Sequence, residues 1–191
     1  MVLVLSYDIL SKFIGTKILR FDNGSLSLLD RNMIIIPVEV ILKMQEDLEG
    51  KIGSEAAEEM IYNAGRFETL TGSIRYLQRR DELKTVFSSV SKTGDPSIEM
   101  GREMLKFMGK GDIKIKEMID NGRKIVLSSN SPFSAEYLKT RGKSKGPVCH
   151  YLRGVMCGVM EAYYGGTYKT KETICAATGL SKECVFEFIK E

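Results

Sequence analysis

Three cysteines and one glutamate near the C-terminal end constrain this chain of 191 residues more than any other feature. Three separate elements, the start of a long helix and two strands, are expected to carry them: Cys149, Glu172, Cys175 and Cys184. Three thiolates and a carboxylate oxygen can form a tetrahedral shell around Zn²⁺. A bound ion would hold these elements together, because a strand–loop–strand unit this short buries little apolar area of its own. Since a full shell leaves no open position, the pattern predicts a structural rather than a catalytic zinc site.

The alternative is a group of buried apolar thiols without an ion, because free cysteine is among the most buried residue types. The spacing also differs from the paired CxxC motifs of a zinc ribbon. The fourth cysteine, Cys157, lies in an apolar run and is expected in the core. His150, the only histidine, could donate to a metal ligand, replace Glu172 as a ligand, or be an ordinary residue on the surface or at the start of a helix.

The composition is that of an ordinary globular protein, with 43% hydrophobic and 28% charged residues. A net charge of +3 is too small to indicate a nucleic-acid or membrane surface. No apolar run approaches the roughly 20 residues that span a bilayer, and the opening residues lack the basic flank of a signal peptide. We expect one cytoplasmic domain over residues 1–191 with reduced thiols, in which residues 1–30 form an N-terminal extension or hairpin and residues 109–190 the metal-containing core segment.

Apolar spacing and turn residues predict an α+β fold in two layers, with a mostly antiparallel sheet packed against helices. Helices are expected after Pro37, after Ser54, in a third segment ending near residue 83, from residue 96 to 107, after Ser131, and over residues 148–164. Extended segments are expected within residues 18–36, 113–127, 167–170 and 184–189. Asn121-Gly122 predicts a two-residue type I′ turn, and residues 139–145 a mobile basic loop.

The C-terminal part of the chain carries a set of motifs: Pro147-Val148-Cys149-His150-Tyr151, Gly154, Gly158, Glu172-x-x-Cys175, Gly179 and Cys184-x-Phe186. These motifs resemble those of the 4-vinyl reductase (V4R) domain, which occurs in archaeal stand-alone proteins and in the sensor modules of aromatic-responsive transcription activators. The resemblance is most specific over residues 109–190 and extends, more weakly, from Pro37 onward. The metal ligands of the family correspond one for one to Cys149, Glu172, Cys175 and Cys184.

The resemblance implies a fold related to the transport-particle (TRAPP) subunits, which form dimers and enclose apolar cavities. It also implies a homodimer and a small apolar or aromatic ligand. The run lengths and the small net charge argue against a membrane or a nucleic acid as partner. Flexible methionines and flat rings suit such a ligand, although an ordinary core contains the same residues. The candidates for lining the cavity are Met104, Phe107, Phe133, Tyr137, Tyr151, Met156 and Met160.

Two other functions are considered. The family name suggests a reductase, or a reductase-associated protein of tetrapyrrole-type metabolism, but Gly109-Lys110-Gly111 lacks the setting and spacing of a nucleotide-binding loop. We therefore expect sensing or carrying rather than catalysis. Residues 172–185 also read as a DNA-binding helix–turn–helix with Gly179 at the turn. The β-forming residues 184–189 and nearby glutamates argue against it.

Overall fold

The computed structural model describes residues 14–15, 17–78 and 96–191. Its main helices are α2 (Val38–Ile52), α3 (Ser54–Gln78), α5 (Pro96–Phe107), α6 (Pro132–Arg141) and α7 (His150–Tyr164). A small antiparallel sheet has the order β1-β2-β3, with strands Leu19–Asp22, Ser25–Leu28 and Arg31–Met33. The larger antiparallel sheet has the order β4-β5-β7-β6, with strands Ile113–Ile119, Lys124–Ser129, Cys184–Lys190 and Tyr168–Ile174. The predicted α+β fold with antiparallel sheets is confirmed.

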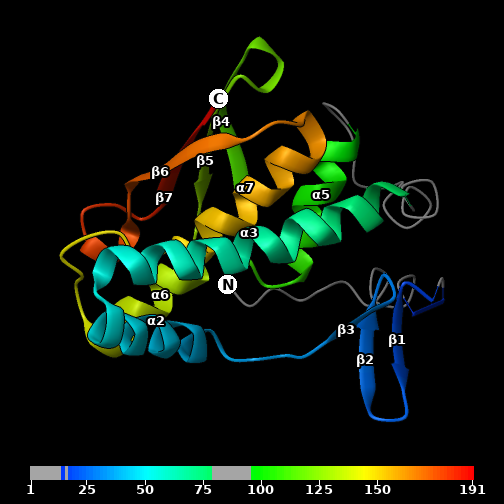
Figure 1. Cartoon of the computed structure of the whole chain (residues 1–191), viewed down its shortest axis with the longest axis horizontal. Helices are drawn as coiled ribbons and strands as arrows, with labels where there is room; N and C mark the ends of the chain where they lie inside the picture. The colour runs from blue at the N-terminus through cyan, green and yellow to red at the C-terminus, as the bar shows by residue number, and fades with distance from the viewer. Residues whose placement is uncertain (1–13, 16, 79–95) are drawn as a thin grey trace.

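Helix α7 lies between the large sheet and α3 (Figure 1). The small sheet lies to one side of these layers, near the C-terminal end of α3. One face of the sheet is apolar because side chains alternate along each strand. On β7 the side chains of Cys184, Phe186 and Phe188 are fully buried, which confirms that they share one face of a strand. Ile125 and Leu127 of β5 extend this face, and the main core forms where it meets α7.

Helices α3 and α7 approach so closely that glycine is required at their contact. A Cβ atom on Gly154 would overlap the Tyr62 carbonyl oxygen and lie 2.9 Å from the Arg66 nitrogen. The hydroxyl of Thr69 donates to the Val155 carbonyl at 2.7 Å across the same contact. Arg66 and Glu161 form an ion pair of 2.7 Å between the two helices. Backbone-to-backbone packing of this kind makes α3 and α7 one rigid unit.

Several sequence-based expectations about the elements are wrong in detail. Helix α3 continues without a break through Gly65 and Gly72, where we expected two helices. Tertiary contacts outweigh the low helix propensity of glycine, because Gly65 packs on the backbone of α7 and Gly72 lies against the Arg31 side chain. The end of the third helix, near residue 83, lies outside the described residues. The β4–β5 connection is a four-residue loop rather than a type I′ turn, since Ile119 pairs with Lys124 and Asp120, Asn121 and Gly122 all have positive φ.

The C-terminal segment does not form a helix–turn–helix. Residues 168–174 form strand β6, only Ala176–Thr178 form a short 3-10 turn (η2), and β7 begins at Cys184. Strand pairing across β6 and β7 therefore replaces both helices of the DNA-binding alternative. Separately, none of the helices in the described ranges combines the length and the apolar character of a membrane span.

Candidate metal centre and apolar cavities

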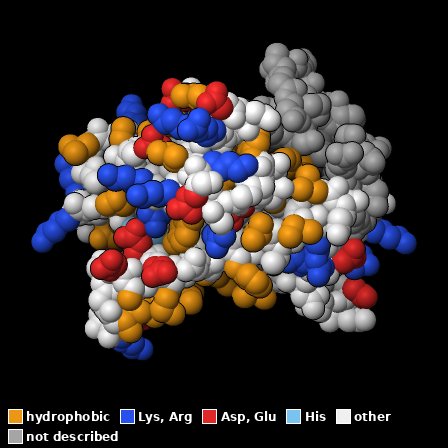
Figure 2. Space-filling model, turned by 45° about the horizontal axis from the view of Figure 1, so that its top comes forward, with side chains coloured by type: hydrophobic (Ala, Val, Ile, Leu, Met, Phe, Trp, Pro, Cys, Tyr) orange, Lys and Arg blue, Asp and Glu red, His pale blue; other side chains and the backbone are white. Residues whose placement is uncertain are grey.

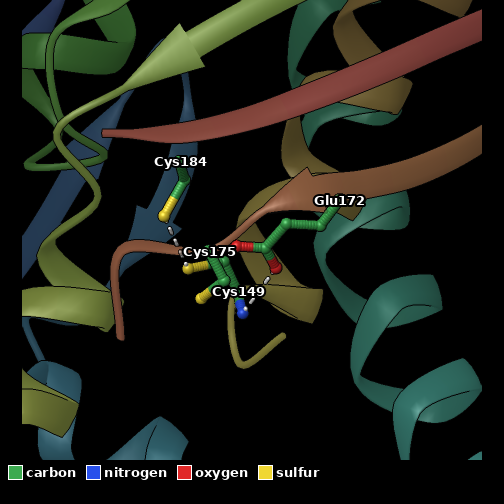
Figure 3. A group of neighbouring side chains, drawn as sticks. All are labelled: Cys149, Glu172, Cys175 and Cys184. Carbon is green, nitrogen blue, oxygen red and sulfur yellow. Dashed lines mark hydrogen bonds between the residues drawn. The ribbon is translucent and has the colours of Figure 1, made fainter. Parts of the chain in front are cut away.

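The structure brings Cys149, Glu172, Cys175 and Cys184 together at one end of the large sheet. Their candidate ligand atoms all lie within 4.8 Å of one another, and all four residues are buried. Cys149 is the N-cap of α7, Glu172 lies on β6, Cys175 precedes η2, and Cys184 begins β7 (Figure 3). Segments far apart in the sequence thus converge on one point, as the sequence predicted.

The direction of Glu172 follows from the alternation of β6. Tyr168 and Glu172 are buried and the residues between them are exposed or half-buried, so both side chains belong to the inner face. The pairing of β6 with β7 then shifts between Glu172 and Ile174, a bulge that breaks this alternation. As a result Ile174 is 44% exposed, whereas the next residue, Cys175, is buried.

Backbone N–H groups support the donor set. The N–H of Cys149 donates to Oε2 of Glu172 at 3.1 Å, and the N–H of Ala176 donates to Sγ of Cys184 at 3.2 Å. The αL conformation of Gly179 (φ 77°) ends η2 and lets the chain turn back into β7. The Ser131 hydroxyl also lies 3.1 Å from Sγ of Cys149. Such contacts stabilise thiolate and carboxylate charge.

The residues present fit a zinc ion. The Sγ atoms of Cys149 and Cys184 lie 3.6 Å apart, close to the roughly 3.8 Å expected for two sulfurs bound tetrahedrally at about 2.3 Å. Oε1 of Glu172 is buried and has no hydrogen-bond partner among the described residues. Figure 3 shows one carboxylate oxygen on the side of the sulfurs and the other on the Cys149 nitrogen. A buried acceptor without a donor is costly, and a cation at this point would satisfy it.

Without a cation the group cannot be fully ionised. Burial, together with the neighbouring Cys175, raises the pKa of Glu172 to about 8. Burial also raises the pKa of the Cys149 thiol well above its usual value. In contrast, hydrogen bonds from Cys149 and Cys175 lower the pKa of Cys184 to about 4. Coulomb repulsion at this spacing thus favours an anionic Cys184 beside a protonated Cys149 and a protonated Glu172.

His150 and Cys157 belong to other contacts. His150 begins α7, as one of the alternatives predicted, but it is 5% exposed and does not lie on the surface. Its Nδ1 lies 3.5 Å from Oε1 of Glu58, and Arg153 pairs with the same oxygen at 2.9 Å. His150 and Arg153, which lie one and four residues after Cys149, thus contact Glu58 of α3 instead of the thiols. Cys157 is fully buried in the core, where burial raises its pKa to about 11.

Two apolar cavities flank helix α5. The first, which we call the hairpin cavity, lies between the small sheet and the helices. Its volume, measured as the space open to the centres of water-sized spheres, is about 60 Å³. One water needs roughly 10–15 Å³ on the same measure. The wall of the hairpin cavity includes Leu28, Met33, Gly72, Tyr76, Met104 and Met108. The sheet cavity, of about 30 Å³, lies against the large sheet and includes Ile115, Leu127, Met156 and Met160. Gly101, Leu105, Val159 and Tyr163 line both cavities.

The candidates for ligand contact divide between these cavities and the core. Met156 and Met160 line the sheet cavity, and Met104 lines the hairpin cavity. The remaining candidates line neither cavity: Phe133, Tyr151, Tyr137 and Phe107.

Phe133 packs on the Tyr151 ring with centroids 5.6 Å apart. The Tyr151 hydroxyl donates to Glu68, which also pairs with Lys110 at 3.1 Å. The Arg141 guanidinium stacks over the Tyr137 ring. Phe107 packs against a second buried cluster, which includes Leu19 and Leu28 of the small sheet.

Sequence reasoning missed the shared wall of the cavities. Gly101 and Leu105 lie four residues apart on α5, and Val159 and Tyr163 lie four apart on α7. This spacing is a signal that each pair shares one helix face, but it does not indicate the cavity beside that face. The arginine and glutamate of the hairpin cavity, Arg31 and Glu68, had no such signal because they come from a short strand and a distant helix.

Known proteins share this fold. A structure of the phenol-responsive sensory domain of the transcription activator PoxR, with phenol, superimposes with a TM-score of 0.70 at 20% identity, over 97% of this chain and 91% of that one. A vinyl-4-reductase family protein from Methanocaldococcus jannaschii superimposes with a TM-score of 0.50 at 18% identity, over 96% and 93%. No family profile matches the chain, and no curated protein is similar to it in sequence. The resemblance read from the motifs is thus confirmed in the fold.

Proposed function

We propose that this protein binds a small apolar or aromatic molecule beside the shared wall of the two cavities, and acts as a sensor or carrier. The observation that supports this most is the wall itself, in which Leu105, Val159 and Tyr163 lie between two spaces lined mostly by apolar side chains. Such a site, with flexible methionines and few polar groups, selects ligands by shape and apolar area. The same fold is found in a sensory domain that responds to phenol.

A zinc ion held by Cys149, Glu172, Cys175 and Cys184 is the second part of the proposal. The donor set, the sulfur spacing and the unpartnered Oε1 of Glu172 support it. Four protein donors leave no position for substrate, so the ion would stabilise the junction of α7, β6 and β7 rather than take part in chemistry. We accordingly propose a binding protein and not an enzyme, and a homodimer as in the family that the motifs resemble.

Ligand binding is tested by titrating phenol and toluene into the purified protein, with binding followed by calorimetry and by thermal stabilisation. Saturable binding that Val159→Phe weakens supports the proposal, because Val159 lines both cavities and the larger ring would fill them. Val40→Phe is the matched control, since Val40 is 43% exposed on α2. Equal affinity in the two variants would place the ligand elsewhere, and release of a flavin or another redox group on denaturation would favour a reductase-associated role.

A further inference from the structure

One cation interrupts the apolar face of the small sheet that borders the hairpin cavity. Leu28 and Arg31 are paired across the β2–β3 hairpin, and Met33 follows Arg31 on the same face of β3. Leu28 is part of a buried cluster against which Met33 packs. All three residues line the hairpin cavity. Side-chain alternation thus places a guanidinium where an apolar side chain would complete the wall.

This guanidinium is held in position but not neutralised. Its Nη1 donates to the Glu68 carbonyl of α3 at 2.8 Å. A Cβ atom on Gly72 would lie 2.8 Å from the same nitrogen, so glycine leaves the room that the group occupies. The Glu68 carboxylate pairs instead with Lys110 at 3.1 Å and accepts from the Tyr151 hydroxyl. Within the described part of the chain, no carboxylate forms an ion pair with Arg31.

The hairpin cavity therefore carries one positive charge in excess at its polar end. Arg31 and Glu68 are the charged residues of its wall among those that the structure describes, and Lys110 already balances Glu68. Arg31 is half-buried. A cation that is partly removed from water and has no counter-ion is costly, because burial weakens the screening of its charge. A ligand with an anionic group would supply the counter-ion.

The exterior of the molecule offers no comparable attraction for an anion. On the face that Figure 2 shows, basic and acidic side chains are mixed, and the net charge is only +3. Elsewhere on the small sheet, Arg20 of β1 pairs with Asp30 at 2.6 Å. A preference for an anionic ligand would therefore arise inside the cavity and not from a general field.

We propose that the hairpin cavity binds an apolar carboxylic acid as its anion. The carboxylate would accept from the remaining N–H donors of Arg31, since the planar guanidinium matches the two oxygens of a carboxylate. The hydrocarbon part would lie against Met104, Leu105 and Met108. The inference rests on the proposed function and adds the class of the ligand and its orientation. Toluene and neutral phenol fill the same space but cannot supply the negative charge.

The experiment is calorimetric titration of the full chain with benzoate, phenol and toluene near neutral pH, where a carboxylic acid is ionised. Benzoate should bind at least about 10-fold more tightly than toluene, because hydrogen bonds to charged groups are stronger than those between neutral groups. Arg31→Met should lower the affinity for benzoate at least about 10-fold more than the affinity for toluene. Arg20→Met is the matched control, since it removes the same charge from a residue whose side chain is 47% exposed, and it should retain the preference for benzoate.

Arg31→Gln separates the charge from the contact with α3. The amide keeps an N–H donor for the Glu68 carbonyl, so this variant should fold and show the same selective loss of benzoate binding. Circular dichroism and the melting temperature establish that each variant is folded. If both Arg31 variants lower the affinities for benzoate and toluene equally, Arg31 is a packing residue and the inference is overturned.

The three ligands also separate this inference from the proposed function. Saturable binding of phenol and toluene, with benzoate no tighter than toluene, would overturn the anion site and keep the apolar binding site. A preference for benzoate that Arg31→Gln leaves intact would also overturn it, because the anion would then bind elsewhere. Absence of saturable binding by all three ligands would overturn the proposed function itself.

Discussion

The backbone N–H of Cys149 donates to Oε2 of Glu172 at 3.1 Å, although the two residues belong to different elements. This bond places the carboxylate against the N-terminal end of α7, where the helix dipole favours negative charge. It also leaves Oε1 buried without a partner among the described residues. One hydrogen bond thus fixes the carboxylate so that its other oxygen can serve as a ligand.

Glu172→Gln should retain this hydrogen bond and lose the metal. The amide oxygen can still accept from Cys149, but a neutral amide is a poor zinc ligand, so we expect metal affinity to fall at least about 100-fold, at the upper end of effects seen for supporting residues. Competition with a chromogenic chelator measures it. Glu183→Gln removes a half-buried carboxylate that pairs with Lys114 and Lys116 outside the group of four, and it is the matched control. Unchanged metal affinity in Glu172→Gln would remove this residue from the ligand set.

Cys175→Ser and Cys157→Ser should differ in their response to a chelator. Both thiols are buried, but only Cys175 belongs to the group of four. Chelation should lower the melting temperature of the wild type and of Cys157→Ser, by about 6 °C or more if the ion contributes about 3 kcal/mol. Cys175→Ser should already melt at the lower temperature and respond little. Differential scanning fluorimetry with metal analysis checks this, and an equal chelator response in both variants contradicts the assignment.

The stability of the metal-free protein should vary little between about pH 5 and 8. Glu172, with its pKa raised from 4.5 to about 8, contributes stability that is present at low pH and lost as the pH rises through this window. Cys184, with its pKa lowered from 9.0 to about 4, contributes stability that is present at high pH and lost as the pH falls. The two contributions therefore oppose each other.

The metal-loaded protein should behave differently, because protons compete with the ion for Glu172 and Cys149. Its stability should fall steadily as the pH is lowered from 8 to 5. Urea unfolding at several pH values, with and without zinc, measures the difference. Parallel pH profiles for the two forms would contradict a metal bound by these groups.

Periodicity identified those elements in which one face is buried. The apolar run of α7 and the alternation of Cys184, Phe186 and Phe188 follow directly from burial, and turn residues such as Ser131 and Gly165 gave the ends of helices. Helix α3 was divided at its glycines because the close approach of Gly154 and α3 is a tertiary fact that a local pattern does not contain.

For the candidate site, the sequence predicted the metal donors but not the cavity wall. The four donors were identified because the chain has only four cysteines, and because three of them together with Glu172 match a motif of the family that the chain resembles. The cavity wall was not, because Leu105, Val159 and Tyr163 resemble any other core residues until the packing of α5 against α7 leaves space beside them. Which apolar residues face a cavity depends on how all the helices and strands pack together, and a local sequence pattern does not contain that packing.

Gly101→Ala should raise stability and weaken ligand binding. Gly101 is within α5, where alanine is favoured over glycine by about 1 kcal/mol. A Cβ atom there would meet only Tyr163, at an ordinary contact distance of 3.4 Å, and would enter the space of both cavities. We expect a melting temperature higher by about 2–4 °C and a weaker affinity for phenol. A more stable variant with unchanged phenol affinity would show that the ligand lies away from the shared wall.

Gly154→Ala should have the opposite effect on stability. The added methyl group would overlap the Tyr62 carbonyl and crowd the Arg66 nitrogen, and both are backbone atoms of α3 that cannot turn aside. Separating the helices would break the Thr69–Val155 hydrogen bond and the Arg66–Glu161 ion pair, so we expect a loss of about 3 kcal/mol or more in urea unfolding. Gly50→Ala is the control, since a Cβ atom at Gly50 in α2 meets nothing within 4 Å and should stabilise slightly. If Gly154→Ala unfolds at the urea concentration of the wild type, the close contact of α3 and α7 does not determine the stability of this core.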